Sequence, residues 1–197
     1  MAQLVFRADS NGALVAWLSG RAQALGRPCV VALDGRSGSG KSTLGAQLAA
    51  TLDAVVLEGD DFFAGGVAVR TDAPEARARD CIDWRRQRPV LEALRANRRA
   101  SYLAFDWQTF DGRCAEEPRS VEPRPIVLFE GVYSARPELS SWVDFRILLS
   151  VGEETRIARL LAREGRISAW ERQWHEAEDW YFAHAAKPAE FDVIVGE

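Results

Sequence analysis

Residues 35–43 have the types and the spacing needed to bind a chain of phosphate groups. The segment reads Gly-Arg-Ser-Gly-Ser-Gly-Lys-Ser-Thr and follows an apolar run that is typical of a strand. Glycines let the backbone adopt positive φ angles and approach a polyanion closely. Successive N–H groups and the start of a following helix then form a cradle for anions. The spacing Gly-x-x-x-x-Gly-Lys-Ser over residues 35–42 therefore predicts a phosphate-binding loop, the P-loop motif.

The chemistry of this loop indicates ATP as the ligand and Mg²⁺ as its metal. The Lys41 ammonium can reach the β- and γ-phosphates, and the Ser42 hydroxyl can ligate Mg²⁺. Lys41 is one of two lysines in the chain, beside Lys187. The residues that we expect to contact the nucleotide are Gly35, Arg36, Ser37, Gly38, Ser39, Gly40, Lys41, Ser42 and Thr43.

Two acidic segments follow apolar runs at the expected ends of strands. Asp60 and Asp61 come after the run 54–57, and Glu130 comes after the run 126–129. A carboxylate at such a place can accept a proton from a hydroxyl group or hold a metal-bound water. The alternatives are an Asp-rich turn and a charged residue that merely marks a strand exit. We expect Asp60 to be the base and Glu130 to help Ser42 hold Mg²⁺.

Arginines recur along the predicted helix 153–164. Arg156, Arg159 and Arg163 are spaced by three and four residues, which places them along one helix face. Arginines can neutralise the charge that develops on a transferring phosphoryl group. The alternative is a solvated helix face on which neighbouring glutamates pair with them. We select Arg159 and Arg163 as the candidates for charge neutralisation.

Other conspicuous side chains favour structural roles. His175 and His184 have no acidic or thiol partner at metal-ligand spacing, so we expect both at the surface. Trp170 and Trp174 are four residues apart on a predicted helix, which is more typical of a core stripe than of a stacking platform.

Short apolar strands alternate with helices along the chain. We expect strands at 29–34, 54–57, 101–105, 126–129, 146–151 and 191–195, and helices at 11–25, 41–52, 88–98, 153–164 and 168–186. Residues 64–80 and 111–125 read as surface segments without regular structure. This order predicts an α/β fold, a three-layer sandwich with a mainly parallel sheet and helices on both faces. Ligands then bind beyond the carboxyl ends of the strands.

Composition limits the broad class of the protein. The chain has 197 residues and is 47% hydrophobic, which suits one domain over 1–197 with its own core. A net charge of −4 argues against general nucleic-acid binding. Three widely spaced cysteines suggest neither zinc nor a disulfide framework. No segment resembles a signal peptide or a membrane span, so we expect a cytoplasmic protein with no membrane partner. Whether it forms a homo-oligomer is left open.

Together these motifs resemble the uridine kinase-like P-loop kinases, the group that includes phosphoribulokinase and pantothenate kinase. The resemblance covers about residues 28–197, with residues 1–27 as an N-terminal helix before the core. Asp60-Asp61-Phe62-Phe63 is similar to the family's Asp-x-Phe-Tyr segment, which implies that Asp60 is the catalytic base. Leu128–Gly131 resembles the family's strand-end Glu motif. The region of about 152–167 resembles the lid, which implies phosphate-facing arginines.

The acceptor region departs from the family pattern. Residues 104–113 resemble an aromatic-Asp-aromatic triplet followed by His and Arg, but Phe110 stands where His is expected. Phenylalanine cannot hydrogen-bond a pyrimidine edge, so this loss should change the substrate. The candidate acceptor contacts implied by the resemblance are Asp61, Asp83, Phe105, Asp106 and Arg113.

We therefore expect an enzyme that moves the γ-phosphoryl group of ATP to a hydroxyl of a small molecule. A nucleoside is the acceptor that the resemblance implies; a sugar, a pantothenate-like alcohol or a nucleotide is the alternative. From a different class, an ATP-regulated binding or switch protein would use the same loop. Asp60 separates the two classes, since a kinase needs a base beside the acceptor and a switch does not.

Overall fold

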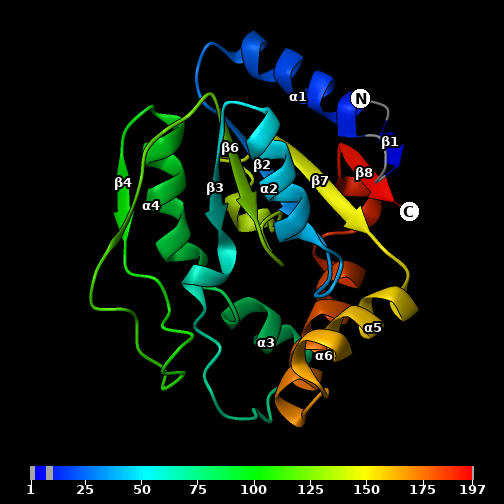
Figure 1. The fold of residues 1–197 in the computed structure, drawn as a ribbon. Coiled ribbons are helices and arrows are strands. Elements are labelled where there is room, and N and C mark those ends of the chain that lie inside the picture. The colour runs from blue at the N-terminus through cyan, green and yellow to red at the C-terminus, as the bar shows by residue number, and fades with distance from the viewer. Residues whose placement is uncertain (1–2, 8–10, 197) are drawn as a thin grey trace.

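A six-stranded parallel sheet forms the centre of the computed structural model, which describes residues 3–7 and 11–196 (Figure 1). The strand order is β1-β8-β7-β2-β6-β3. These strands are β1 (Leu4–Arg7), β2 (Cys29–Asp34), β3 (Ala54–Glu58), β6 (Ile126–Glu130), β7 (Phe145–Ser150) and β8 (Val193–Gly196). Parallel neighbours need crossover connections, and helices supply most of them here. The sheet confirms the predicted α/β class.

Helices cover both faces of the sheet. They are α1 (Asn11–Leu25), α2 (Lys41–Thr51), α3 (Pro74–Asp80), α4 (Trp84–Arg95), α5 (Glu153–Glu164) and α6 (Ala169–His184). Side chains alternate along β2, so that Val31 and Leu33 join the apolar core under α1 and α2, while Val30 and Ala32 join the core under α4 and α6. Because β2 and β6 are buried on both faces, they are apolar almost throughout, so their apolar runs could be recognised in the sequence.

The N-terminal region differs from the expectation of a helix alone. Residues Leu4–Arg7 form β1, which pairs in parallel with β8 at the edge of the sheet. This short strand alternates half-buried and exposed residues. It lacks a continuous apolar run, and its partner is almost the whole chain away. The sequence also predicts Ser10 or Asn11 as the cap of α1, and these positions lie outside the residues and side chains described.

Two segments expected to be irregular contain regular structure. Within 64–80, residues Pro74–Asp80 form α3, which packs against α6 and buries Arg77 beside Glu176. Within 111–125, residues Arg119–Val121 form β5, which pairs antiparallel with β4 (Ala100–Tyr102) in a separate two-stranded sheet. Both segments are charged, so their regular structure depends on tertiary partners that local sequence does not reveal.

Helix α4 begins earlier than expected. We predicted a start near Pro89, but the helix starts at Trp84, with the Asp83 carboxylate accepting a hydrogen bond from Arg85 N. Pro89 therefore lies inside the helix, where it costs one backbone hydrogen bond. The apolar residues Val90, Leu91 and Leu94 offset the missing hydrogen bond by packing into the core.

No helix formed by residues 11–196 combines the length and apolar character that crossing a bilayer would require.

Candidate active site

The predicted phosphate-binding loop connects β2 to α2 at the carboxyl end of the sheet. Gly38 and Gly40 have φ angles of 79° and 97°, in the region that favours glycine. The loop also packs tightly, because a Cβ atom on Gly38 would lie 2.7 Å from the carbonyl oxygen of Arg156. The backbone amides are thus held in a turn that a side chain at Gly38 would disrupt.

Asp34, the last residue of β2, anchors the start of the loop. Its fully buried carboxylate accepts hydrogen bonds from Gly35 N at 2.7 Å, Tyr133 N at 3.2 Å, Ala135 N at 3.0 Å and Tyr181 Oη at 2.8 Å. Burial nevertheless raises the pKa of Asp34 to about 6, because the hydrogen bonds only partly offset the loss of hydration. Sequence reasoning missed this residue; an acid that ends an apolar strand directly before the glycines was its signal.

Helices α5 and α6 hold the loop from outside. Arg156 donates to the Ser37 carbonyl oxygen at 2.8 Å, and Arg159 donates to the Ser39 carbonyl oxygen at 3.1 Å. From α6, the buried Glu178 carboxylate accepts from Ser37 N at 3.0 Å and from the Ser37 hydroxyl. The arginine-bearing helix therefore contacts the phosphate loop directly through Arg156 and Arg159, while charge neutralisation during transfer stays a prediction.

Lys41, Ser42 and Glu130 meet at the first turn of α2. Lys41 Nζ donates to the Arg36 carbonyl oxygen at 3.2 Å, and Ser42 Oγ donates to Glu130 Oε1 at 3.1 Å. The pKa of Glu130 is raised to about 7, chiefly by burial and then by the nearby Asp60 carboxylate, against the attraction of Lys41. The Ser42 hydroxyl and the Glu130 carboxyl group therefore lie side by side at the start of α2.

Asp60 lies beside Glu130 because two glycines let their strands approach. A Cβ atom on Gly59 would lie 2.9 Å from Glu130 O, and one on Gly131 would lie 3.6 Å from Asp60 Oδ1. Asp60 is exposed and lines the cleft. The walls of the cleft partly desolvate its carboxylate, which raises the pKa of Asp60, with Lys41 acting in the opposite direction. A raised pKa makes the carboxylate a stronger base.

The oxygen donors near the loop fit Mg²⁺. Mg²⁺ is usually held by one or two protein oxygens together with phosphates and waters, and Ser42 and Glu130 offer such a pair. Within the described part of the chain, no group of three or more His, Cys, Asp or Glu side chains could hold a metal ion. An ion bound here would take its remaining ligands from phosphate oxygens and waters.

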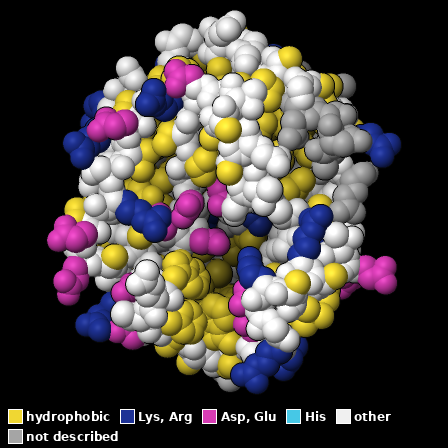
Figure 2. Space-filling model, viewed as in Figure 1, with side chains coloured by type: hydrophobic (Ala, Val, Ile, Leu, Met, Phe, Trp, Pro, Cys, Tyr) yellow, Lys and Arg dark blue, Asp and Glu magenta, His cyan; other side chains and the backbone are white. Residues whose placement is uncertain are grey.

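A cleft of about 960 Å³ opens beyond the P-loop. The predicted residues Lys41, Asp60 and Glu130 line it, as do Arg159 and Arg163 of α5. Figure 2 shows acidic side chains in the middle of this face, directly above a patch of hydrophobic side chains. One cavity thus brings together the phosphate loop, the acids and the arginines that lay far apart in the sequence.

No family model and no curated protein matches this chain significantly. Among solved structures, a possible uridine kinase from Bacillus stearothermophilus is 19% identical, with a TM-score of 0.65 over 92% of this chain and 96% of that one. The chain has the fold of the uridine kinase-like P-loop kinases.

Two further structures share the uridine kinase-like fold. A protein provisionally assigned as a fructose transport system kinase, from Silicibacter sp. TM1040, is 25% identical, with a TM-score of 0.58 over 85% of this chain and 89% of that one. A D-glycerate 3-kinase from Cryptococcus neoformans is 15% identical, with a TM-score of 0.59 over 86% of each chain. These names differ in the molecule that is phosphorylated, so the shared fold does not identify an acceptor.

The candidate acceptor contacts lie outside the lining of the cleft of this uridine kinase-like fold. Asp83 caps α4, and Phe105 is buried behind Phe63 with ring centroids 5.0 Å apart. Asp106 accepts from Gln108 N and Thr109 N, while Arg113 pairs with Asp111. These four side chains shape the neighbouring loops; direct contact with an acceptor stays a prediction for them.

Asp61 is buried in a network behind the cleft. Its carboxylate accepts from Tyr102 Oη at 2.7 Å and from Arg119 Nη1 at 2.8 Å. Arg119 also reaches Glu58, at 3.2 Å. The network connects the small β4–β5 sheet to the segment that carries Asp60. Asp61 therefore helps to fix the position of the adjacent Asp60.

Aromatic side chains line the rest of the cleft, which the sequence did not reveal. Trp174 belongs to the apolar core and Trp170 packs against it, as expected of a core stripe, and both also line the cleft beside half-buried His175. Phe110, the residue in the expected His position, and Trp107 join them there. The adjacent Phe62-Phe63 pair was the available signal, since Phe62 is fully buried while Phe63 reaches the cleft.

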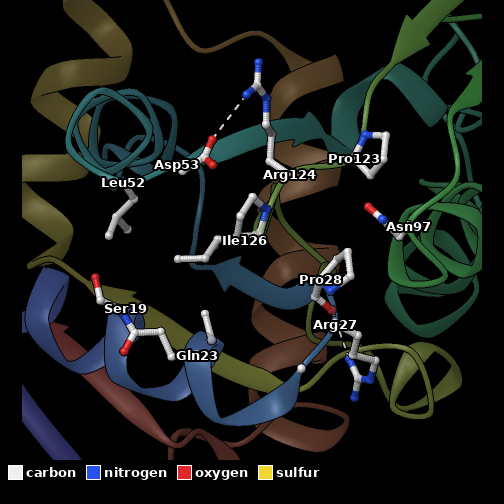
Figure 3. Close-up of a pocket in the computed structure, with 13 residues that line it drawn as sticks. Ser19, Gln23, Arg27, Pro28, Leu52, Asp53, Asn97, Pro123, Arg124 and Ile126 are labelled. Atoms are coloured by element: carbon white, nitrogen blue, oxygen red, sulfur yellow. Dashed lines mark hydrogen bonds and ion pairs between the residues drawn. The ribbon is translucent and has the colours of Figure 1, made fainter.

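A second cavity, of about 570 Å³, lies at the amino-terminal ends of the central strands (Figure 3). It is formed where β2, β3 and β6 begin, together with the end of α1. Its charged side chains are already paired, Arg124 with Asp53 and Arg27 with Asp144. In parallel α/β sheets, ligands bind at the carboxyl ends of the strands, so the cleft and not this cavity is the candidate active site.

Proposed function

We propose that this protein is a magnesium-dependent kinase that transfers the γ-phosphoryl group of ATP to a hydroxyl of a small molecule. The observation that carries the proposal is the placement of Lys41, Ser42, Glu130 and Asp60 at one end of a 960 Å³ cleft. The cleft leaves room beyond Asp60 for a second molecule. A P-loop with a base and an adjoining pocket is what phosphoryl transfer to an alcohol requires.

In this proposal, different residues bind the phosphates, the Mg²⁺ ion and the transferring phosphoryl group. Backbone amides of residues 35–42 and the Lys41 ammonium hold the phosphates. Ser42 and Glu130 would hold Mg²⁺, which neutralises charge on the β- and γ-phosphates when bound. Arg159 and Arg163 line the same cleft and would neutralise charge on the transferring group.

Asp60 acts on the acceptor. Its carboxylate orients the acceptor hydroxyl and takes the hydroxyl proton as the oxygen bonds to the γ-phosphorus. The bond between that phosphorus and the β–γ bridging oxygen breaks, and ADP leaves with the electron pair. The raised pKa of Asp60 favours acceptance of the proton.

We further propose that the accepting alcohol belongs to the class used by uridine kinase-like enzymes. The resemblance of the segment Asp60–Phe63 supports a nucleoside, while Phe110 in place of the expected His supports a different alcohol such as a sugar. A panel of nucleosides, sugars and pantothenate-like alcohols, followed by ADP release, separates these substrates.

Magnesium-dependent binding of ATP tests the proposal at its base. Calorimetric titration should show ATP binding with Mg²⁺ that weakens strongly with EDTA. Ser42→Ala should lose much of the magnesium dependence, whereas Ser101→Ala on exposed β4 should keep it. Absence of magnesium-dependent ATP binding in the wild type would falsify the proposal. ATP turnover that no alcohol accelerates would favour the switch-protein alternative.

A further inference from the structure

Two buried charged side chains from two helices hold Ser37 of the P-loop. The Glu178 carboxylate of α6 accepts hydrogen bonds from Ser37 N at 3.0 Å and from the Ser37 hydroxyl. The Arg156 guanidinium of α5 donates to the Ser37 carbonyl oxygen at 2.8 Å. Glu178 is 3% exposed and Arg156 is 8% exposed, so both contacts are largely shielded from water. All three polar groups of Ser37 are therefore engaged by α5 and α6.

The contact with Glu178 fixes one peptide plane of the loop. The C=O and N–H groups of a trans peptide point in opposite directions, and no peptide bond of the described residues is cis. Because Ser37 N points to Glu178, the Arg36 carbonyl oxygen of the same peptide points the other way. There it accepts from Lys41 Nζ at 3.2 Å and from Ser39 N at 3.1 Å. A carboxylate on α6 is thus connected to the Lys41 ammonium through one rigid peptide group.

The orientation of this peptide affects how well Lys41 can bind phosphate. A lysine side chain has many rotamers, and fixing one of them costs entropy. The ammonium has three N–H donors, so the bond to Arg36 O leaves the other two for phosphate oxygens. An ammonium that is already held in the cleft needs less ordering when a nucleotide binds, which favours affinity.

The negative charge of Glu178 opposes nucleotide binding. Glu178 lines the same cleft as Lys41 and Asp60. Burial raises the pKa of Asp60, Lys41 lowers it, and the Glu178 charge adds to the increase, so the field of Glu178 reaches the active site. A negative charge there repels the phosphates of ATP. Any benefit of Glu178 to nucleotide binding must therefore come from the hydrogen bonds that it accepts, which a neutral acceptor would also provide.

We propose that Glu178 is a positioning residue for the phosphate-binding Lys41. Its carboxylate fixes the peptide between Arg36 and Ser37, and the carbonyl oxygen of that peptide holds the ammonium in the cleft. The inference rests on the proposed kinase function and adds to it a residue that acts on the nucleotide through Lys41. The property that matters is hydrogen-bond acceptance from Ser37, and not negative charge.

Variants at one position separate these two properties. Glu178→Gln keeps an oxygen acceptor for Ser37 N and removes the charge. Glu178→Ala and Glu178→Leu both remove the acceptor, and the leucine fills the space that alanine leaves empty. Glu92→Ala, at an exposed glutamate of α4, is the matched control. Calorimetric titration measures the affinity for magnesium-ATP and for magnesium tripolyphosphate, which has phosphates but no base. Denaturant unfolding of the same samples ensures that only folded proteins are compared.

Loss of the acceptor should weaken the binding of both probes. Glu178→Ala and Glu178→Leu should each lower affinity about tenfold, since leaving a buried N–H without its partner costs on the order of this factor. Glu178→Gln should bind both probes at least as tightly as the wild type, because the acceptor remains and the repelling charge is gone. Glu92→Ala should match the wild type.

A double variant tests whether the effect passes through Lys41. When Lys41 is already alanine, adding Glu178→Leu should weaken magnesium-ATP binding by less than about twofold, because the group that Glu178 positions is no longer there. A side chain with a purely structural role would lower the unfolding free energy without this dependence on Lys41.

Three results would overturn the inference. The first is wild-type affinity for both probes in folded Glu178→Leu. The second is an equal loss of affinity in Glu178→Gln and Glu178→Leu, which would make charge the important property. The third is an undiminished loss from Glu178→Leu in the Lys41→Ala background. In each case magnesium-dependent ATP binding by the wild type would leave the kinase proposal standing, whereas its absence would refute the proposed function itself.

Discussion

The two ends of the cleft are held together by different interactions. At the P-loop end, buried charges and backbone amides are paired by hydrogen bonds, as at Asp34, Arg156 and Glu178. At the other end, aromatic side chains are held by ring packing. A hydrogen-bonded charge network fails when one member is removed, because its partner is left buried and unpaired. Ring packing tolerates exchange of one flat side chain for another. The P-loop end should thus be intolerant of change, and the end lined by an aromatic wall of Phe63, Trp107, Phe110, Trp170 and Trp174 should be adaptable.

Lys41→Ala should give the largest effect. Removing the ammonium should lower kcat about 10³-fold or more, which corresponds to roughly 4 kcal/mol of transition-state stabilisation. Steady-state ADP release measures this, with Lys187→Ala as a control at an exposed position. Near-normal turnover in Lys41→Ala would show that the P-loop end is as adaptable as the wall.

Asp60→Asn should lower kcat on the order of 10²- to 10³-fold, because the amide cannot take the hydroxyl proton. ATP affinity should change little, since Asp60 faces the acceptor. ADP release and calorimetry together separate the two effects. Asp53→Asn is the control, because Asp53 lies just before β3, at the end of the strands away from the cleft. Turnover within a few-fold of wild type would remove Asp60 from the role of base.

Asp34→Asn should destabilise the fold in a way that depends on pH. Asp34 has a pKa raised from 3.8 to about 6, so the wild type is stabilised by its protonated form below pH 4 and loses that stability as pH rises to about 6. A shift of about 2 units corresponds to roughly 3 kcal/mol. The asparagine does not titrate. Denaturant unfolding measures the unfolding free energy of the wild type and the variant at pH 4 and pH 7. The wild type minus variant difference should be larger at pH 4 than at pH 7, and an equal difference at both pH values would contradict this account.

Tyr102→Phe should give the smallest effect. It removes one hydrogen bond to Asp61 and leaves the Arg119 ion pair in place, so the cost should be about 1 kcal/mol of unfolding free energy. Phe62, whose ring centroid lies 4.6 Å from that of Tyr102, keeps its packing partner. Chemical denaturation measures the change. A cost of several kcal/mol would show that the acceptor side also depends on its polar contacts.

The contrast also explains what the sequence revealed. The P-loop is contiguous, and its glycines, lysine and serine act through local geometry, so residues 35–43 predicted the turn between a strand and a helix. The central strands were predicted because burial on both faces makes them apolar. The position of Glu130 beside Ser42 followed from the rule that parallel strands end at one edge of the sheet.

The aromatic wall could not be predicted in the same way. Phe63, Trp107 and Trp170 come from distant segments, and each alone is typical of a core residue. Their common exposure to a cleft depends on how α6 and the loop before β5 pack, which no local pattern encodes. The same holds for β1 and α3, whose partners lie far along the chain.

Helix α6 carries contacts to both ends of the cleft. Trp170 and Trp174 belong to the wall, Glu178 holds the P-loop, and Tyr181 donates to Asp34. Spacings of four, four and three residues place them along one helix face. If ATP and an acceptor bind at the two ends as proposed, a rigid rotation of this helix would disturb both sites at once and would couple their binding. Such coupling is reciprocal: a nucleotide that tightens acceptor binding by some factor would itself be retained more strongly by the same factor.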